Sequence, residues 1–128
     1  MNFNGYYKSE SKEFVDWYAG RKIVDFKHVY IKFNIDGIFI MREKTPDFDF
    51  VSFAKKQSKE DCLKNYSIPY GVYRCENDLL FLDIKKDVNW TRCFKYKIID
   101  SESFVDLEDD RVYHFIPVDD PEFEKLPM

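Results

Sequence analysis

Stretches in which every second residue is apolar run through most of the chain, and they constrain its fold more than any other feature. Residues 29–35 show this two-residue period, which is typical of a β-strand that buries one of its two faces. The dipeptide Asp36-Gly37 follows. Because Gly accepts a positive φ and Asp tolerates one, this pair suits a tight turn. Residues 38–44 then return with large apolar side chains on both faces. The sequence therefore predicts a β-hairpin over residues 28–44.

The same alternation recurs elsewhere and predicts further strands. They are expected at residues 3–8, 47–53, 70–75, 79–85, 92–99, 104–107 and 111–116. Polar turns join the later ones, at residues 76–78, 100–102 and 108–110. Short strands joined in succession by short turns are typical of an antiparallel up-and-down meander. The predicted fold class is all-β.

Residues 11–20 break the alternation. The aromatic residues Phe14, Trp17 and Tyr18 fall at i, i+3 and i+4, and Gly20 follows them. This spacing places apolar side chains on one face of a helix, and a Gly commonly ends one. The segment predicts a short helix.

Two later segments also break the alternation. Residues 58–66 begin with Ser58 and have an acid at Asp61, a spacing close to that of a helical capping box, which predicts a second short helix. Residues 117–128 contain three Pro and four acids. We expect them to form an irregular acidic tail.

The chain has 128 residues, which is the size of one domain with its own core. A meander of eight or nine strands must close or be covered, because open sheet edges pair with other chains. A barrel of about eight strands has an interior that side chains fill or that holds one small ligand. We therefore predict a single closed barrel over residues 1–128, with one or two short helices.

The first predicted strand is similar to that of a known group of barrels. Residues 3–8 read FNGYYK and resemble the Gly-x-Trp strand of the calycins, which include the lipocalins and the intracellular fatty-acid-binding proteins. Gly5 matches the family's Gly, and Tyr7 stands in the place of its Trp. In the fatty-acid-binding branch a helical segment with aromatic residues follows this strand, and residues 11–20 occupy that place. The resemblance implies a calycin-like, lipocalin-like barrel.

The last strand of the fatty-acid-binding branch often carries Arg-x-Tyr, whose two side chains hold a ligand carboxylate. Residues 111–113 read RVY, so the resemblance implies that Arg111 and Tyr113 bind such a group. Alternatively, Arg111 ends the acidic turn before it and pairs with those acids in water.

Arg74 and Arg92 are further candidate ligand-binding residues, since each lies within a predicted strand among aromatic residues. An Arg that points into an apolar interior needs a partner, either an internal acid or a bound anion. An Arg that points outward lays its stem across exposed aromatic rings instead. The sequence leaves both orientations open.

No reaction signature is found. The two His have no Cys, His or acid at metal-ligand spacing, which favours a structural role over a metal site. G-x-S-x-G, GxGxxG and P-loop motifs are absent from the sequence, so neither an esterase-type nucleophile nor a nucleotide site is predicted. We expect a protein that is not an enzyme and that uses no cofactor.

Charge and cysteine content bear on partners and location. The net charge is −4, with Lys and Glu mixed throughout, which disfavours nucleic-acid binding. The three Cys lack CxxC spacing, as expected for reduced thiols in a cytoplasmic protein. A signal peptide and an apolar run near the ~20 residues of a membrane span are also not visible.

Two functions follow from this architecture. The first is non-catalytic binding of a small apolar or amphipathic ligand inside the barrel. The second is a filled barrel that acts through its outer surface, as a protein-interaction or inhibitor/immunity-type module. Residues 38–39 and 79–82 are apolar on both strand faces, and this predicts an outer cover from a helix, a second subunit of a homodimer or a protein partner.

Overall fold

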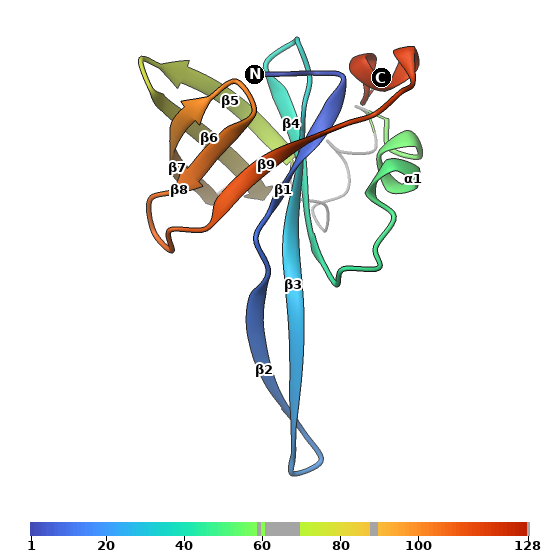
Figure 1. The fold of residues 1–128 in the computed structure, drawn as a ribbon, viewed down its shortest axis with the longest axis vertical. Helices are drawn as coiled ribbons and strands as arrows, with labels where there is room; N and C mark the ends of the chain where they lie inside the picture. Colours follow the sequence, from blue (N-terminus) through green and yellow to red (C-terminus); the bar gives the residue numbers. More distant parts are fainter. Residues whose placement is uncertain (59, 61–69, 88–89, 128) are drawn as a thin grey trace.

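The strands form one antiparallel sheet that closes on itself (Figure 1). The computed structural model describes residues 1–58, 60, 70–87 and 90–127. Its elements are β1 (Gly5–Ser9), β2 (Lys12–Tyr18), β3 (Arg21–Phe33), β4 (Ile38–Lys44), α1 (Phe50–Lys55), β5 (Tyr70–Glu76), β6 (Leu79–Asp87), β7 (Trp90–Asp100), β8 (Ser103–Asp106), β9 (Val112–Pro117) and the 3-10 helix η1 (Pro121–Lys125). The strand order is β1-β9-β8-β7-β6-β5-β4-β3-β2, and β1 also pairs with β3. Eight strands therefore make an up-and-down barrel, and β2 is an extra strand outside it.

Strand β3 belongs to two structures. Its residues 28–33 pair with β4, and residues 30 and 31 also pair with β1, which closes the barrel. Its residues 21–27 pair with β2. Residues 12–27 thus form a two-stranded arm that projects from one end of the barrel (Figure 1).

The hairpin predicted over residues 28–44 is confirmed. Gly37 has a φ of 89°, and its N–H donates to the carbonyl oxygen of Asn34 at 3.1 Å. Because Gly lacks a Cβ, it adopts this left-handed conformation without steric cost. The predicted strands at 3–8, 70–75, 79–85, 92–99, 104–107 and 111–116 are also confirmed, as β1 and β5 to β9.

The helix predicted over residues 11–20 is wrong, because Lys12–Tyr18 form strand β2. The residues that follow, Ala19 and Gly20, have φ values of 50° and 77°. Two positive φ values in succession make the kind of tight turn whose twist matches a β-hairpin. Gly20 therefore serves a hairpin turn, and pairing with residues 21–27 overrides the helical spacing of the aromatic residues.

The strand predicted over residues 47–53 is also wrong. Helix α1 begins at Phe50, and the Asp49 carboxylate caps it by accepting the backbone N–H of Ser52 at 3.1 Å. An Asp at this position satisfies an N–H group that the first helical turn leaves without a partner. The second predicted helix, over residues 58–66, lies outside the described residues apart from Ser58 and Glu60.

The tail predicted to be irregular is ordered. Residues 121–125 form η1, and Asp120 caps it by accepting the N–H of Glu122 at 3.0 Å. Phe123 is fully buried and Leu126 nearly so. The buried apolar residues hold this segment against the barrel, while Asp120 and Pro121 begin its 3-10 helix.

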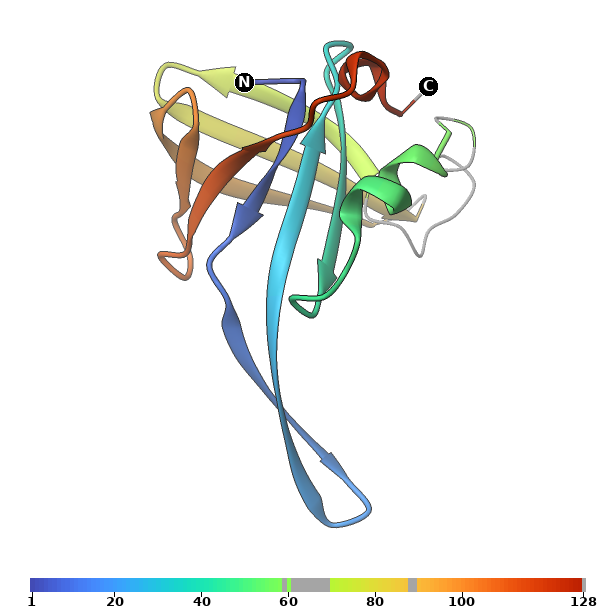
Figure 2. The ribbon, with the colours of Figure 1, turned by 45° about the vertical axis from the view of Figure 1, so that its right-hand side comes forward.

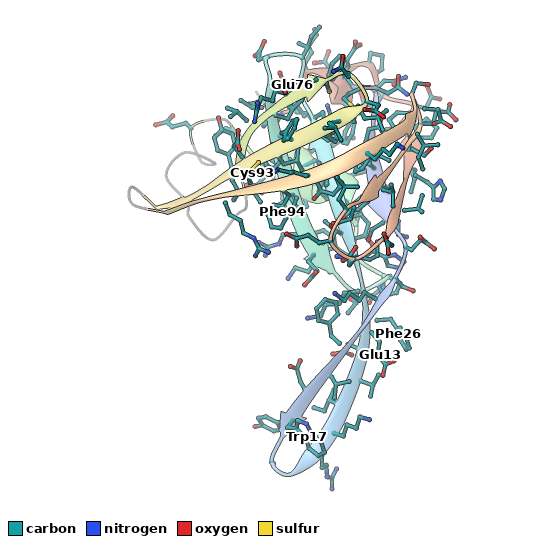
Figure 3. The ribbon with its side chains drawn as sticks, turned by 90° about the vertical axis from the view of Figure 1, so that its left-hand side faces the viewer. Glu13, Trp17, Phe26, Glu76, Cys93 and Phe94 are labelled. Carbon is teal, nitrogen blue, oxygen red and sulfur yellow. The ribbon has the colours of Figure 1, made fainter. Side chains whose placement is uncertain are left out.

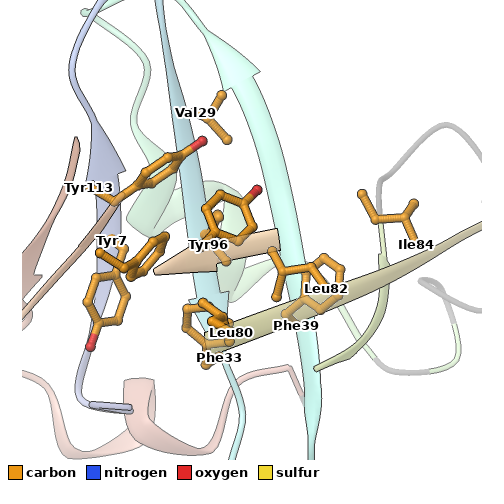
Figure 4. Packing of buried hydrophobic residues seen from close by; sticks show 11 residues of the cluster. Tyr7, Val29, Phe33, Phe39, Leu80, Leu82, Ile84, Tyr96 and Tyr113 are labelled. Carbon is orange, nitrogen blue, oxygen red and sulfur yellow. The ribbon is translucent and has the colours of Figure 1, made fainter. Parts of the chain in front are cut away.

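An aromatic core fills the middle of the barrel (Figure 4). Its buried members are Tyr7, Val29, Ile31, Phe33, Phe39, Leu80, Leu82, Ile84, Tyr96, Phe104 and Tyr113. The Phe104 ring stacks on Tyr113, with centroids 4.8 Å apart, and Tyr7 lies 5.0 Å from Phe104 on the other side. Large side chains thus occupy most of the interior.

A second apolar cluster lies outside the barrel wall. It contains Tyr30, Ile40, Phe50, Ala54, Phe123 and Leu126. Helix α1 and η1 lie on the side of the barrel formed by β3 and β4 (Figure 2). They provide the outer cover predicted for strand 38–44. They also bury Lys32 on β3 and Asn34 directly after it, although the alternation assigns this face to solvent.

Candidate functional site

A cavity of about 330 Å³ lies at one end of the barrel, and we call it the barrel-end pocket. Its lining residues are Val29, Met41, Glu43, Arg92, Phe94, Tyr96, Asp106, Arg111 and Tyr113. Figure 4 shows the hydroxyls of Tyr96 and Tyr113 directed toward Val29, and that of Tyr7 directed the opposite way. The aromatic core therefore forms the floor of this pocket.

Alternation along the strands explains which side chains reach the pocket. On β7, Tyr96 is buried and Phe94 packs against the core, so Arg92 lies on the same inward face, two residues nearer the barrel end. On β9 the buried side chain is Tyr113. Arg111 precedes β9 by one residue and shares its inward face. The structure thus brings Arg92, Arg111 and Tyr113 together.

Arg111 is the most constrained of the three. Its Nε donates to Oδ2 of Asp109 at 2.8 Å, and its backbone N–H donates to Oδ1 of the same residue at 3.0 Å. The side chain is only 14% exposed. Arg111 therefore pairs with the turn acid Asp109, but at a site shielded from water and not at the exposed end of the turn. Its Nη1 is buried and has no hydrogen-bond acceptor among the described residues. A buried donor without an acceptor is costly, so this guanidinium can take an acceptor from a ligand.

Arg92 lies at the rim. Its guanidinium is 4.3 Å from the centroid of the Phe94 ring, and its Nη2 is 3.7 Å from Oε2 of Glu108. Its side chain is about half exposed, at 49%. The ion pair with Glu108 is therefore weak, and Arg92 can turn toward an anion in the pocket mouth.

The two tyrosines offer neutral hydroxyls. Burial raises the pKa of Tyr96 far above its ordinary value, and the Tyr113 hydroxyl adds to this through its charge and a hydrogen bond. Burial also raises the pKa of Tyr113, although the nearby Arg111 guanidinium opposes the shift. Both groups therefore stay protonated. Because one hydroxyl donates to the other, only the accepting hydroxyl of the pair keeps its proton for a ligand in the pocket.

Acids balance the two arginines. Asp106 is only 6% exposed and accepts the N–H of Glu108 at 2.7 Å. Burial raises its pKa, and that hydrogen bond opposes the shift. Glu43 also lines the pocket. The pocket thus combines polar groups from β4, β7, β8 and β9 with apolar walls from Val29, Met41 and Phe94.

Arg74 is not part of this group. Its guanidinium lies 4.3 Å from the centroid of the Phe81 ring, and its Nη1 is 2.8 Å from Oε1 of Glu76. On β5 the neighbouring Tyr73 packs against the core, so Arg74 lies on the outer face. Of the two orientations considered for Arg74, the inward one is wrong. Arg74 also lies over the outward-facing Phe81 ring of strand β6. The cover predicted for this strand was a helix, a second subunit or a protein partner.

Sequence reasoning missed Asp106, because this acid belongs to an acidic cluster that is easily interpreted as a solvated turn. The two-residue alternation of strand β8 nevertheless indicates that Asp106 is buried. Phe104 on β8 is buried, and a residue two positions later lies on the same face of a strand. The burial of Asp106 follows directly from that spacing.

The described residues offer neither a candidate membrane-spanning helix nor a candidate metal site. They contain no helix with the length and hydropathy that a membrane span requires. Within the same ranges there is no group of three His, Cys, Asp or Glu side chains arranged to hold a metal ion.

No protein-family model, curated protein or solved structure matches this chain.

Proposed function

We propose that this protein is a non-catalytic binding protein that holds a small amphipathic anion in the barrel-end pocket. One observation carries the proposal: Nη1 of Arg111 is buried in the wall of a 330 Å³ cavity, and no acceptor for it is found in the part of the chain that the structure describes. A carboxylate is the acceptor whose geometry best matches a guanidinium.

The pocket offers two kinds of contact to such a ligand. Arg111 and Tyr113 can donate to a single carboxylate, and charge-assisted bonds of this kind contribute roughly 1.5–3 kcal/mol in a shielded site. Met41, Phe94 and Val29 supply apolar contact for the rest of the molecule. A volume of 330 Å³ is at the lower end for small-molecule sites. The ligand class is therefore a carboxylate with a short acyl chain or one or two rings.

We further propose a distant relation to the calycins. The closed up-and-down barrel supports it. Gly5 also supports it, because a Cβ there would lie 2.2 Å from the carbonyl oxygen of Ile116, so strand β9 approaches too closely for any side chain. The arm departs from the family pattern, since a hairpin replaces the helical segment after the first strand. A cytoplasmic location belongs to the same proposal and is supported by the exposed free thiols of Cys75 and Cys93.

A second candidate function is favoured by a different observation. Most of the barrel interior is filled by aromatic side chains, and the arm exposes large apolar residues. This combination supports the alternative of a module that acts through its outer surface.

Titration of a small fluorescent carboxylate with one or two aromatic rings tests the main proposal. Wild type should bind the probe, and Arg111→Ala should weaken binding about tenfold or more. The matched control is Arg74→Ala, which removes the same charge from the outer face and should leave the affinity unchanged. A neutral alcohol analogue should bind both variants alike. If Arg111→Ala and Arg74→Ala bind the carboxylate equally well, the pocket is not its site.

A further inference from the structure

The arm exposes apolar side chains on both of its faces. They are Val15, Trp17, Tyr18, Ile23, Val24 and Phe26, each between 41% and 74% exposed. Figure 3 shows Trp17 near the tip and Phe26 near the base, both clear of the barrel. An isolated two-stranded hairpin is at best marginally stable in water, and exposed apolar groups that cluster in this way mark an interaction surface.

The arm also has an open edge. Strand β2 is the last strand in the sheet order, so along the described sheet the edge that faces away from β3 has no neighbour. Backbone N–H and C=O groups along such an edge are available for pairing with another strand. An occupant that adds a strand there would satisfy them and extend the arm into a wider sheet.

Charges on β2 show which strand fits. Lys12, Phe14 and Asp16 alternate along one face, with Glu13 and Val15 on the other. When the strand is laid antiparallel to a copy of itself and centred on Phe14, each Lys12 lies opposite the partner's Asp16. The two Phe14 rings then meet at the two-fold axis. Opposite charges placed directly across two strands are stabilising.

Neighbouring registers lack this match. Centring the pair on Glu13 or on Asp16 places two acids directly opposite each other, which is unfavourable. Centring it on Val15 places Lys12 opposite the partner's Tyr18 and leaves the charges without opposite partners. The charge pattern of β2 thus selects the register centred on Phe14.

We propose that a second copy of this chain occupies the open edge, with β2 paired antiparallel to its symmetry mate about an axis at Phe14. The contact gives a four-stranded sheet from two arms, with Trp17 and Tyr18 extended over the base of the partner's arm. This proposal does not depend on the function proposed for the barrel-end pocket.

The arm is less suited to a lipid bilayer. Glu13, Asp16 and Asp25 are spread along it between the apolar residues, so insertion beyond the tip would place carboxylates in hydrocarbon. In an edge-paired dimer the same acids stay at a water-exposed surface or pair with Lys12. A contact confined to two arms belongs with the small, transient interfaces, so we expect the dimer to be weak and to depend on protein concentration.

Sedimentation velocity over a concentration series from about 1 to about 300 μM tests the proposal. Wild type should pass from monomer to dimer. Asp16→Lys should weaken the dimer at least ~tenfold, because two opposite-charge pairs become two like-charge pairs. Lys12→Asp should do the same. The double variant Lys12→Asp/Asp16→Lys restores both pairs with reversed sign, so its affinity should return to within about threefold of wild type.

Arg21→Asp is the matched control. It makes the same change of charge as Lys12→Asp on the same face of the arm, but on β3, away from the open edge. It should leave the dissociation constant of the dimer within about threefold of wild type.

Lys12 also lies 3.7 Å from Asp109, so Lys12→Asp removes an ion pair within the chain as well. The comparison of Asp16→Lys with the double variant is therefore decisive, and circular dichroism verifies that each variant is folded. A wild type that stays monomeric overturns the proposal, and its sedimentation with anionic vesicles would assign the arm to a membrane. A double variant as weak as the single ones overturns it as well.

Discussion

Nε of Arg111 donates to Oδ2 of Asp109 at 2.8 Å, and Nζ of Lys12 lies 3.7 Å from the same oxygen. A single carboxylate oxygen therefore lies between the pocket arginine and the base of the arm. It fixes the direction of the guanidinium, and it also places a negative charge beside the atoms that would bind an anion.

Asp109→Asn should strengthen the binding of a carboxylate probe. The single Asn oxygen can still accept one of the two hydrogen bonds that Arg111 donates to Asp109, and the charge that repels an anion is removed. At such a partly shielded site the removed repulsion is on the order of 1 kcal/mol, or about fivefold in the dissociation constant. Fluorescence titration measures it. Asp110→Asn, next to it on the exposed part of the turn, is the control and should change the affinity little; equal gains in both variants would indicate a general charge effect.

Lys32 should contribute stability that rises as the pH increases from about 8 to about 10, and the difference between wild type and Lys32→Met isolates this contribution from the tyrosines that oppose it. Burial lowers the pKa of Lys32 to about 8, although the Glu124 carboxylate opposes the shift, and an exposed Lys titrates near 10.4. In this range the unfolded chain binds the proton that the folded chain has released, so the free energy of unfolding increases with pH. The increase is roughly 2–3 kcal/mol. Urea unfolding at a series of pH values measures it.

Above about pH 10 the trend should reverse. Burial raises the pKa of Tyr73 to about 12 and also raises the pKa of Tyr7, so the folded chain keeps protons that the unfolded chain loses. Lys32→Met should abolish the rise below pH 10 and keep the fall above it. Lys97→Met, at an exposed position, should keep both. A rise that persists in Lys32→Met would assign it to another group.

Gly37→Val should destabilise the protein by roughly 1 kcal/mol or more, because a β-branched residue does not tolerate the positive φ at this position. A Cβ there would meet nothing within 4 Å, so the cost is conformational and not steric crowding. Gly37→Asn is the control and should cost less, since Asn adopts left-handed conformations more readily. Thermal melting compares the three proteins. Equal melting temperatures would contradict the claim that the positive φ at residue 37 requires a Gly.

Phe123→Ala should destabilise the protein by about 3–5 kcal/mol. The ring is fully buried against the outer face of the barrel, where its centroid lies 6.5 Å from that of Tyr6. Glu122→Ala, one residue away and exposed, should have little effect. Denaturant unfolding distinguishes the two, and a small loss from Phe123→Ala would mean that the C-terminal segment is only loosely attached.

The barrel could be predicted from the sequence because its signal is local. Residues 29–35 alternate over their whole length and lead into a turn whose Gly37 has one clear use. The arm could not be predicted in the same way. The aromatic residues of Lys12–Tyr18 fit a helical period as well as a strand, and the choice depends on pairing with residues 21–27.

The burial of polar groups was harder to predict than the strands. Lys32 alternates with core residues as a solvent-facing residue would, yet η1 covers it and the carbonyl oxygen of Glu124 lies 3.5 Å from its Nζ. That cover comes from a segment 92 residues away in the chain. Of the ligand-binding candidates, Arg92 and Arg111 reach the pocket whereas Arg74 does not, because the inward or outward face of each strand is set by the register of the whole barrel.

Strand β3 runs through thirteen residues without a Gly or a Pro. Its last arm residue, Lys27, is two positions from Val29 in the wall of the pocket. The arm and the wall of the pocket therefore share one continuous strand. If association of the arm changes the ligand affinity of the pocket by some factor, a ligand in the pocket must change the association constant of the arm by the same factor.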